Sequence, residues 1–302
     1  MGNYSPINSN SAINTDLTLY QGQRIRLAFY HTANATGQNA GWYIDHVKMW
    51  KDPLSVTLIS QNGRTQFTRI TPAIEQAVNG DLIEVSPATY EENLNFSGKQ
   101  IMLHSLEIGG AIIEGHGIDI IEFNNNEEAK SVLQGFTIVN GLNGIKCFGA
   151  SPIIINCIIR NNIKSGIECY DSAQPLIKNC TIVNNESGIY ASSSSPKILN
   201  SIFWNNDVDL GDCSATFSRV GDPNDIGLGN HKFDPGFINL TNHDYHLSQM
   251  SLCIDAGELW ADYSNEPHPN GSRVNMGAFG NTSEAMTTKD SDGDGLPDAW
   301  EL

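Results

Sequence analysis

Residues 138–203 contain three copies of one scheme: IVNGLNGIKCFGASPIIINCI (138–158), IRNNIKSGIECYDSAQPLIKNCT (159–181) and IVNNESGIYASSSSPKILNSIF (182–203). Each copy runs from an apolar residue near Asn through Gly-Ile and Pro to Asn-Cys or Asn-Ser. Gly144, Gly166 and Gly188 lie 22 residues apart, and each precedes an Ile. A repeat of this length predicts coils that stack on one another.

The segments inside each copy favour strands over helices. GIKCF (144–148), GIECY (166–170) and GIYAS (188–192) are short, alternate apolar with polar residues, and are bounded by Gly, Asn, Ser and Pro. Three such strands per turn, with successive turns stacked in parallel, form a right-handed β-helix. We therefore predict an all-β right-handed parallel β-helix over residues 53–210.

Composition narrows the class of partner. Lys and Arg number 17 against 34 Asp and Glu, so the net charge is −17. Such a chain is repelled by phosphate backbones and anionic lipid, which argues against nucleic acid and membrane surfaces as partners. No run of about 18 apolar residues is present, so membrane insertion is not expected. The 32 Asn residues fit a solenoid whose turns need left-handed backbone and whose amide side chains can stack.

Four of the six cysteines follow the repeat. Cys147 and Cys169 are spaced by 22 residues, and Cys157 and Cys180 by 23, so each pair is expected to stack inward as small buried hydrophobes. Cys213 and Cys253 remain as a candidate disulfide.

The segment before the coil has a different pattern. LTLYQGQRIRLAFYHT (17–32) alternates as an antiparallel strand does, and GWYIDHVKMW (41–50) is a second candidate strand. The second segment resembles the end of a secreted jelly-roll module, with His46 in place of the usual Asp. The resemblance implies that residues 1–52 are part of such a domain. We expect the β-helix to belong to a larger secreted or cell-surface bacterial protein whose signal peptide lies outside this chain.

A short helix is expected where the coil begins. In ITPAIEQAVNGDLIEV (70–85), residues 70, 74, 77 and 78 share one helical face, Thr71 is the expected N-cap, and Gly80 is the expected stop. Residues 70 to about 210 resemble the pectate-lyase-like right-handed β-helix families. That resemblance implies the fold, whereas the fold itself carries lyases, hydrolases, epimerases and proteins without activity.

The repeat ends near residue 210. CIDAGELWADYS (253–264) and RVNMGAFGNT (273–282) resemble the closing segments of secreted bacterial β-helix proteins. We therefore expect residues 211–285 to cap the C-terminal end of the coil.

Residues 290–301, DSDGDGLPDAWE, have the spacing of an EF-hand calcium loop. Carboxylates occupy positions 1, 3, 5, 9 and 12, Gly occupies position 6, and the position 7 residue supplies a main-chain carbonyl. The segment resembles thrombospondin type 3 and dockerin-like calcium linkers, so residues 286–302 are predicted to be a structural Ca²⁺-binding linker. The predicted ligands are Asp290, Asp292, Asp294, Leu296, Asp298 and Glu301.

One outward column is the candidate active site. Equivalent positions after Gly-Ile place Lys146, Glu168 and Tyr190 on neighbouring turns, about 5 Å apart. We expect the column to continue to Asp209 in one direction and to Asp119 in the other. In β-elimination a carboxylate or calcium ion neutralises a uronate, Lys abstracts a proton and Tyr can protonate the leaving oxygen. Paired carboxylates would also suit hydrolysis.

A second column, with Arg160 and Trp204, is the candidate for contacts to sugar rings. The first hypothesis for function is an extracellular module that binds polysaccharide. The alternatives are a carbohydrate-active enzyme, acting as a polyuronate lyase, an epimerase or a glycoside hydrolase through Asp119, Lys146, Glu168 and Tyr190, and a stalk or adhesin without activity.

Overall fold

The computed structural model describes residues 55–221 and 227–288. The predicted jelly-roll segment at 1–52 and the calcium loop at 290–301 therefore lie outside the described residues. Within the described ranges, no helix has both the length and the apolar character needed to cross a bilayer.

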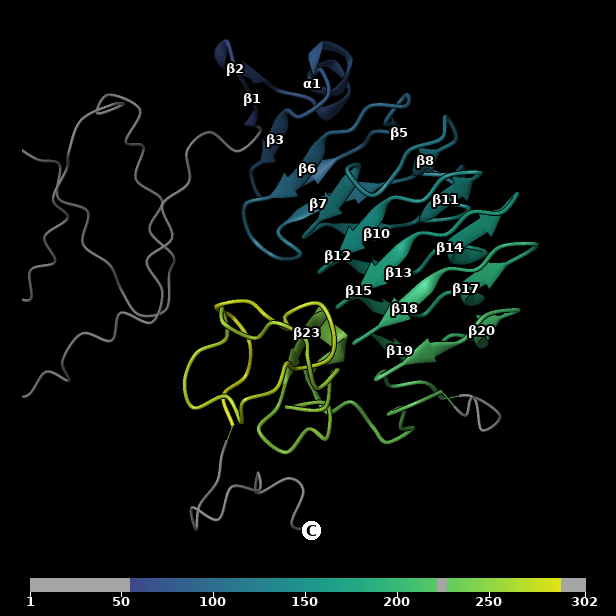
Figure 1. Ribbon diagram of the computed structural model, residues 1–302, viewed down its shortest axis with the longest axis vertical. Coiled ribbons are helices and arrows are strands. Elements are labelled where there is room, and N and C mark those ends of the chain that lie inside the picture. Colours follow the sequence, from purple (N-terminus) through teal and green to yellow (C-terminus); the bar gives the residue numbers. More distant parts are fainter. Residues whose placement is uncertain (1–54, 222–226, 289–302) are drawn as a thin grey trace, which may run out of the picture. The chain divides into compact units, whose positions relative to one another are not determined.

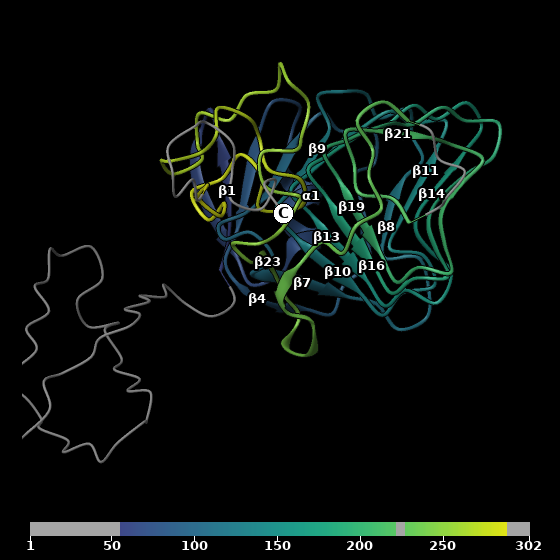
Figure 2. The same ribbon diagram turned by 90° about the horizontal axis from the view of Figure 1, so that it is seen from below.

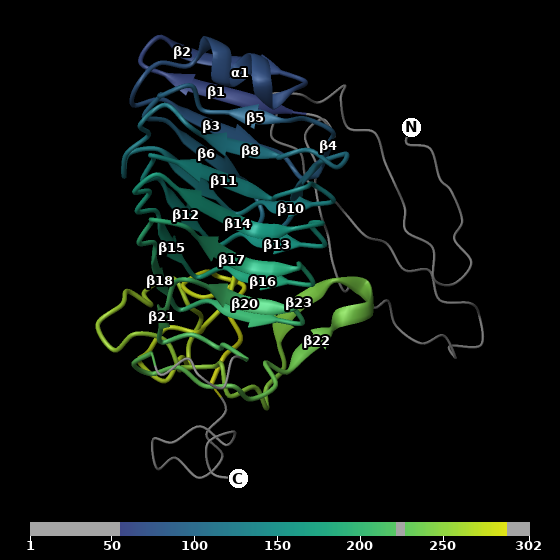
Figure 3. The same cartoon turned by 90° about the vertical axis from the view of Figure 1, so that its right-hand side faces the viewer.

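Six turns of three short parallel strands form the predicted right-handed β-helix (Figures 1 and 3). Each turn contributes one strand to each of three sheets, named here A, B and C, and the antiparallel strands β1 and β2 extend sheet A at its N-terminal end. The strands of sheet A are β2 (Gly63–Phe67), β1 (Val56–Ser60), β3 (Leu82–Val85), β6 (Met102–Ser105), β9 (Val132–Gln134), β12 (Ile153–Ile155), β15 (Leu176–Lys178), β18 (Lys197–Leu199) and β21 (Ala215–Thr216). Those of sheet B are β4 (Ala88–Tyr90), β7 (Ala111–Glu114), β10 (Thr137–Val139), β13 (Ile158–Arg160), β16 (Thr181–Val183) and β19 (Ile202–Trp204). Those of sheet C are β5 (Leu94–Asn95), β8 (Ile121–Phe123), β11 (Ile145–Phe148), β14 (Ser165–Tyr170), β17 (Ser187–Ala191) and β20 (Val208–Gly211).

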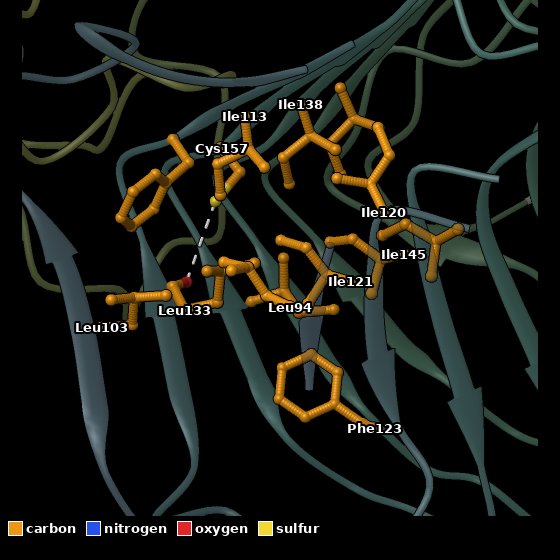
Figure 4. Packing of buried hydrophobic residues seen from close by; sticks show 14 of the residues in the cluster. Leu94, Leu103, Ile113, Ile120, Ile121, Phe123, Leu133, Ile138, Ile145 and Cys157 are labelled. Carbon is orange, nitrogen blue, oxygen red and sulfur yellow. Dashed lines mark hydrogen bonds between the residues drawn. The ribbon is translucent and has the colours of Figure 1, made fainter. Parts of the chain in front are cut away.

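The core consists of columns of inward side chains that stack from one turn to the next (Figure 4). Cys147 and Cys169 are register partners and fully buried, as predicted. Cys157 and Cys180 are also fully buried, and burial raises the pKa of the Cys157 thiol to about 12. These thiols therefore fill space as protonated groups. Cys253 is buried and forms no disulfide, so the candidate bridge to Cys213 is absent.

Amide side chains stack at the corner between sheets B and C. Asn162 donates its main-chain N–H and its Nδ2 to Oδ1 of Asn185, both at 3.0 Å, and Asn185 repeats this pattern with Asn206. The repeated glycines pack closely against this ladder and the next turn, since a Cβ on Gly166 would lie 3.2 Å from Nδ2 of Asn185 and 2.8 Å from the carbonyl oxygen of Gly188. The Asn excess and the Gly-Ile repeat thus share one structural cause.

Helix α1 (Ile70–Gln76) packs Ile70, Ala73 and Ile74 into the N-terminal end of the coil. The burial of Ile70 and Ile74 was predicted, but the helix ends before Gly80, and Val78, expected on the buried face, is 63% exposed. The N-terminus of the helix also differs from the prediction. The carboxylate of Glu92 accepts the N–H groups of Ile70 and Thr71 at 2.8 and 3.0 Å, so the cap comes from the coil rather than from Thr71.

The C-terminal segment, residues 227–288, runs back along the coil beside sheet B. It contains the hairpin β22 (Phe237–Asn239) and β23 (Asp244–Leu247), joined by η2 (Leu240–Asn242), and is otherwise irregular. Tyr245, Ala278 and Phe279 pack against Ile158 and Val183 of sheet B. Figure 2 shows the yellow part of the segment across the coil from β8, β11 and β14. The segment therefore packs against sheet B on one side of the coil, and its yellow part lies away from sheet C (Figure 2).

Candidate functional site

The strand register of sheet C brings three of the predicted residues together. Lys146 of β11 pairs with Glu168 of β14, and Glu168 pairs with Tyr190 of β17. All three side chains lie on the outer face and are half-buried. Toward the N-terminus the column continues to Glu122 of β8.

Asp119 reaches the same column from outside the register. It lies in the turn before β8, and its Oδ2 is 3.1 Å from Nζ of Lys146. Its Oδ1 accepts a hydrogen bond of 2.8 Å from Nδ2 of Asn143. Asp119 is therefore an ion-pair partner of Lys146, while Glu122 occupies the column position that the sequence assigned to Asp119.

A second outward column runs beside the first and contains aromatic side chains. Phe148 of β11 is 50% exposed and pairs with Tyr170 of β14. The Tyr170 hydroxyl donates to Oε1 of Glu168 at 2.5 Å, and the Tyr170 ring makes an edge contact with Tyr190 at 6.3 Å between centroids. Together the two columns and Asp119 form what we call the sheet C strip. It consists of Asp119, Glu122, Lys146, Phe148, Glu168, Tyr170 and Tyr190.

Asn143 links the acidic groups of the strip. Its Nδ2 donates to Asp119 and, at 2.9 Å, to Oε2 of Glu168. The sequence prediction missed Asn143, Phe148 and Tyr170. The two aromatic residues could have been found, because Phe and Tyr both stand two positions after the predicted column residues in GIKCF and GIECY.

The protonation preferences follow from these contacts. The hydrogen bond to Asp119 raises the pKa of Lys146, against a smaller effect of burial, so the amine stays protonated at neutral pH. The hydrogen bond to Glu168 raises the pKa of Tyr170 to about 12. The strip thus presents an ammonium group, a phenol that donates, and carboxylates that accept.

Arg160 and Trp204 of sheet B do not form an open sugar-binding surface. The C-terminal segment covers this sheet, and Val183 between them is fully buried. The guanidinium carbon of Arg219 lies 4.2 Å from the centroid of the Trp204 ring. Burial lowers the pKa of the half-buried Arg160. The face of the Trp204 ring that carries Arg219 is therefore not available to a sugar.

Asp209 also lies outside the site. Tyr190 pairs with Gly211, so the outward column passes over Asp209. The Asp209 carboxylate is buried, accepts from the N–H of Gly221 at 2.6 Å and lies 3.7 Å from Nη1 of Arg219. Asp209 was expected in the outward column, but its carboxylate instead joins β20 to the loop that follows it.

Residues 55–221 and 227–288 contain no cluster of three or more His, Cys, Asp or Glu side chains that could hold a metal ion. The predicted Ca²⁺ ligands at 290–301 are outside these ranges.

The match to a family model agrees with the fold. Residues 93–224 match the family model described as right handed beta helix region. No curated protein matches the chain. A solved structure that is similar is titled "Crystal structure of pectate lyase Pel9A", with 12% sequence identity and a TM-score of 0.33, covering 73% of this chain and 92% of that one.

Proposed function

We propose that the sheet C strip binds polysaccharide. The observation that supports this proposal is the combination of exposed or half-buried aromatic rings with hydrogen-bonding groups in register on a rigid sheet. Aromatic rings offer an apolar face to the C–H groups of a sugar, while carboxylate, ammonium and phenol groups pair with its hydroxyls. Repeated spacing of about 4.8 Å suits a repeating ligand.

Binding accounts for the strip better than β-elimination does. A lysine acting as general base must be unprotonated near the working pH. The contact with Asp119 acts in the opposite direction, because it raises the pKa of Lys146. We therefore assign Lys146 the role of hydrogen-bond donor to a sugar oxygen, with Glu168 and Tyr190 as neighbouring contacts.

A glycan array tests the proposal. We expect the chain to bind at least one polysaccharide, and the double variant Phe148→Ala/Tyr170→Ala to lose at least tenfold in affinity for it, because both stacking surfaces are removed. Trp260→Ala is the matched control, since Trp260 is 92% exposed and belongs to the C-terminal segment. An array without any hit, or binding that depends on Trp260 and not on the strip, would contradict the proposal and leave the stalk or adhesin hypothesis.

We also propose that residues 290–301 bind one structural Ca²⁺ ion, on the strength of the loop spacing. Calorimetric titration of the chain and of its Asp292→Asn variant with CaCl₂ tests this, with heat of binding expected for the first and lost in the second. A secreted or cell-surface location, beside covalently linked domains, is the setting that we propose for both activities.

A further inference from the structure

The charges of the sheet C strip indicate which class of glycan it binds, provided that the strip binds polysaccharide as proposed above. The strip contains three carboxylates, from Asp119, Glu122 and Glu168, and one ammonium group, from Lys146. The Lys146 ammonium lies 3.1 Å from Asp119, so these two charges offset each other. Two carboxylates remain.

Glu122 and Glu168 have only uncharged hydrogen-bond donors. Glu122 accepts from Nδ2 of Asn124 at 3.2 Å, and Glu168 accepts from Asn143 and Tyr170. Within residues 55–221 and 227–288, neither carboxylate forms an ion pair with a basic side chain. Lys146 interacts electrostatically with both carboxylates as well as with Asp119, so the strip, with three carboxylates and one ammonium group, has a formal charge of −2 on a chain of net charge −17.

The spacing of these two charges matches a repeating ligand. Glu122 and Glu168 both pair with Lys146, from opposite sides, so they stand two turns apart in one column. Two strand spacings amount to roughly 10 Å. A polymer with a cationic group on its sugars can place ammonium groups near both carboxylates. A polyuronate would instead bring its carboxylates close to Glu122 and Glu168, which repel them, and the one nearby ammonium group, Lys146, is already paired with Asp119.

We propose that the sheet C strip binds glycans that carry free amino groups, such as polymers of 2-amino-2-deoxyhexose, in preference to polyuronates. The carboxylates of Glu122 and Glu168 pair with the ammonium groups. Phe148, Tyr170 and Tyr190 contact the apolar faces of the rings. Lys146 is held by Asp119 and donates to a ring substituent oxygen.

Calorimetry with three hexasaccharides of equal length tests the assignment: glucosamine hexamer, its N-acetylated form, and hexagalacturonate with and without CaCl₂. We expect the glucosamine hexamer to bind at least fivefold more tightly than the N-acetylated hexamer, which lacks the charge, and hexagalacturonate to bind more weakly than either. In the double variant Glu122→Gln/Glu168→Gln, the glucosamine hexamer and the N-acetylated hexamer should bind with about equal affinity. The control Glu258→Gln/Asp262→Asn removes the same charge from the C-terminal segment and should preserve that advantage.

The outcomes separate the two proposals. Hexagalacturonate binding as tightly as the glucosamine hexamer, in either calcium condition, would overturn the assignment while polysaccharide binding stood. An amine preference that survives in the strip variant, or is lost in the control, would also overturn it. Binding of none of the three, together with an empty glycan array, would overturn the proposed function itself.

Discussion

Glu266 is an almost fully buried acid in the C-terminal segment. The N–H groups of Asn275 and Asn281 donate to its Oε1 at 2.8 and 2.7 Å, while its Oε2 is buried without a hydrogen-bond partner. Burial is the main reason that the pKa of this carboxyl rises from 4.5 to about 7. The ionised form is therefore unfavourable in the folded protein.

This shift predicts a pH dependence of stability. Between pH 4.5 and about 7 the folded protein binds the proton of Glu266 and the unfolded chain does not, so this residue's contribution to stability falls as pH rises through that range. The total change is on the order of 3 kcal/mol. In Glu266→Gln, which keeps the acceptor oxygen, we expect this component to disappear and the stability at pH 8 to equal or exceed that of the parent. The measurement is denaturant unfolding of both proteins at pH 4.5, 6 and 8.

The quantity to compare is the difference in unfolding free energy between the Glu266→Gln variant and the parent at each pH, because other groups also titrate. Burial lowers the pKa of His231 to about 4, which makes its own contribution rise with pH. Parallel pH profiles for the variant and the parent would show that Glu266 has no shifted pKa.

Among single residues, those of the site that lie within the repeat could be predicted from the sequence. Lys146, Glu168 and Tyr190 follow Gly-Ile in consecutive copies, so equal spacing in sequence gave equal positions on the sheet. Asp119 and Asp209 precede and follow the regular copies, where the turn lengths change. A shift of two or three residues there moves a side chain out of the column, and counting along the sequence does not detect it.

At the scale of elements, the turns between sheets A and B hold the C-terminal segment. Asn156, Asn179 and Asn200 occupy these turns with positive φ angles of 53°, 50° and 51°. Nδ2 of Asn156 donates to the carbonyl oxygens of Ala278 and Gly280 at 2.7 and 2.8 Å. Nδ2 of Asn179 likewise donates to the carbonyl oxygen of Asn275 at 3.2 Å, whereas Oδ1 of Asn200 accepts from the N–H of Glu258 at 2.7 Å. Each of these Asn residues therefore forms a turn and bonds to the C-terminal segment.

Removal of these hydrogen bonds should loosen the segment. Asn156→Ala leaves two buried carbonyl groups without their donor, and we expect a loss of about 2 to 4 kcal/mol in the free energy of unfolding. Asn184→Ala is the matched control, because Asn184 also has a positive φ, 56°, but is exposed. Denaturant unfolding and limited proteolysis of both variants provide the comparison. Equal losses would attribute the effect to backbone strain alone.

The sequence predicted the β-helical coil, but it did not predict where the C-terminal segment packs. A period of 22 with Gly, Asn and Pro at fixed places is a local property, and it determined the strands, the inward cysteines and the amide ladder. The side of the coil that residues 227–288 cover depends on contacts between distant parts of the chain, such as Tyr245 with Ile158. The repeat period contains no information on such contacts, so the packing of this segment against sheet B could not be predicted from the sequence.

At the scale of the whole coil, the covered and open sides differ in chemistry. Strands β13 and β16 of sheet B pack against the C-terminal segment, with Val183 buried, and Arg219, which precedes that segment, lies over the Trp204 ring. On sheet C the strip combines aromatic rings with carboxylates, and the yellow part of the segment lies across the coil from it (Figure 2). We therefore propose that ligands bind on sheet C and that sheet B has a structural role.

The most direct test of this account is hydrogen exchange of the chain with and without its tightest-binding glycan, followed by mass spectrometry. We predict that the glycan slows exchange in peptides that contain β11, β14 and β17, with no change in residues 253–288. Protection confined to residues 253–288, or to the strands of sheet B, would contradict the assignment of the strip as the binding site.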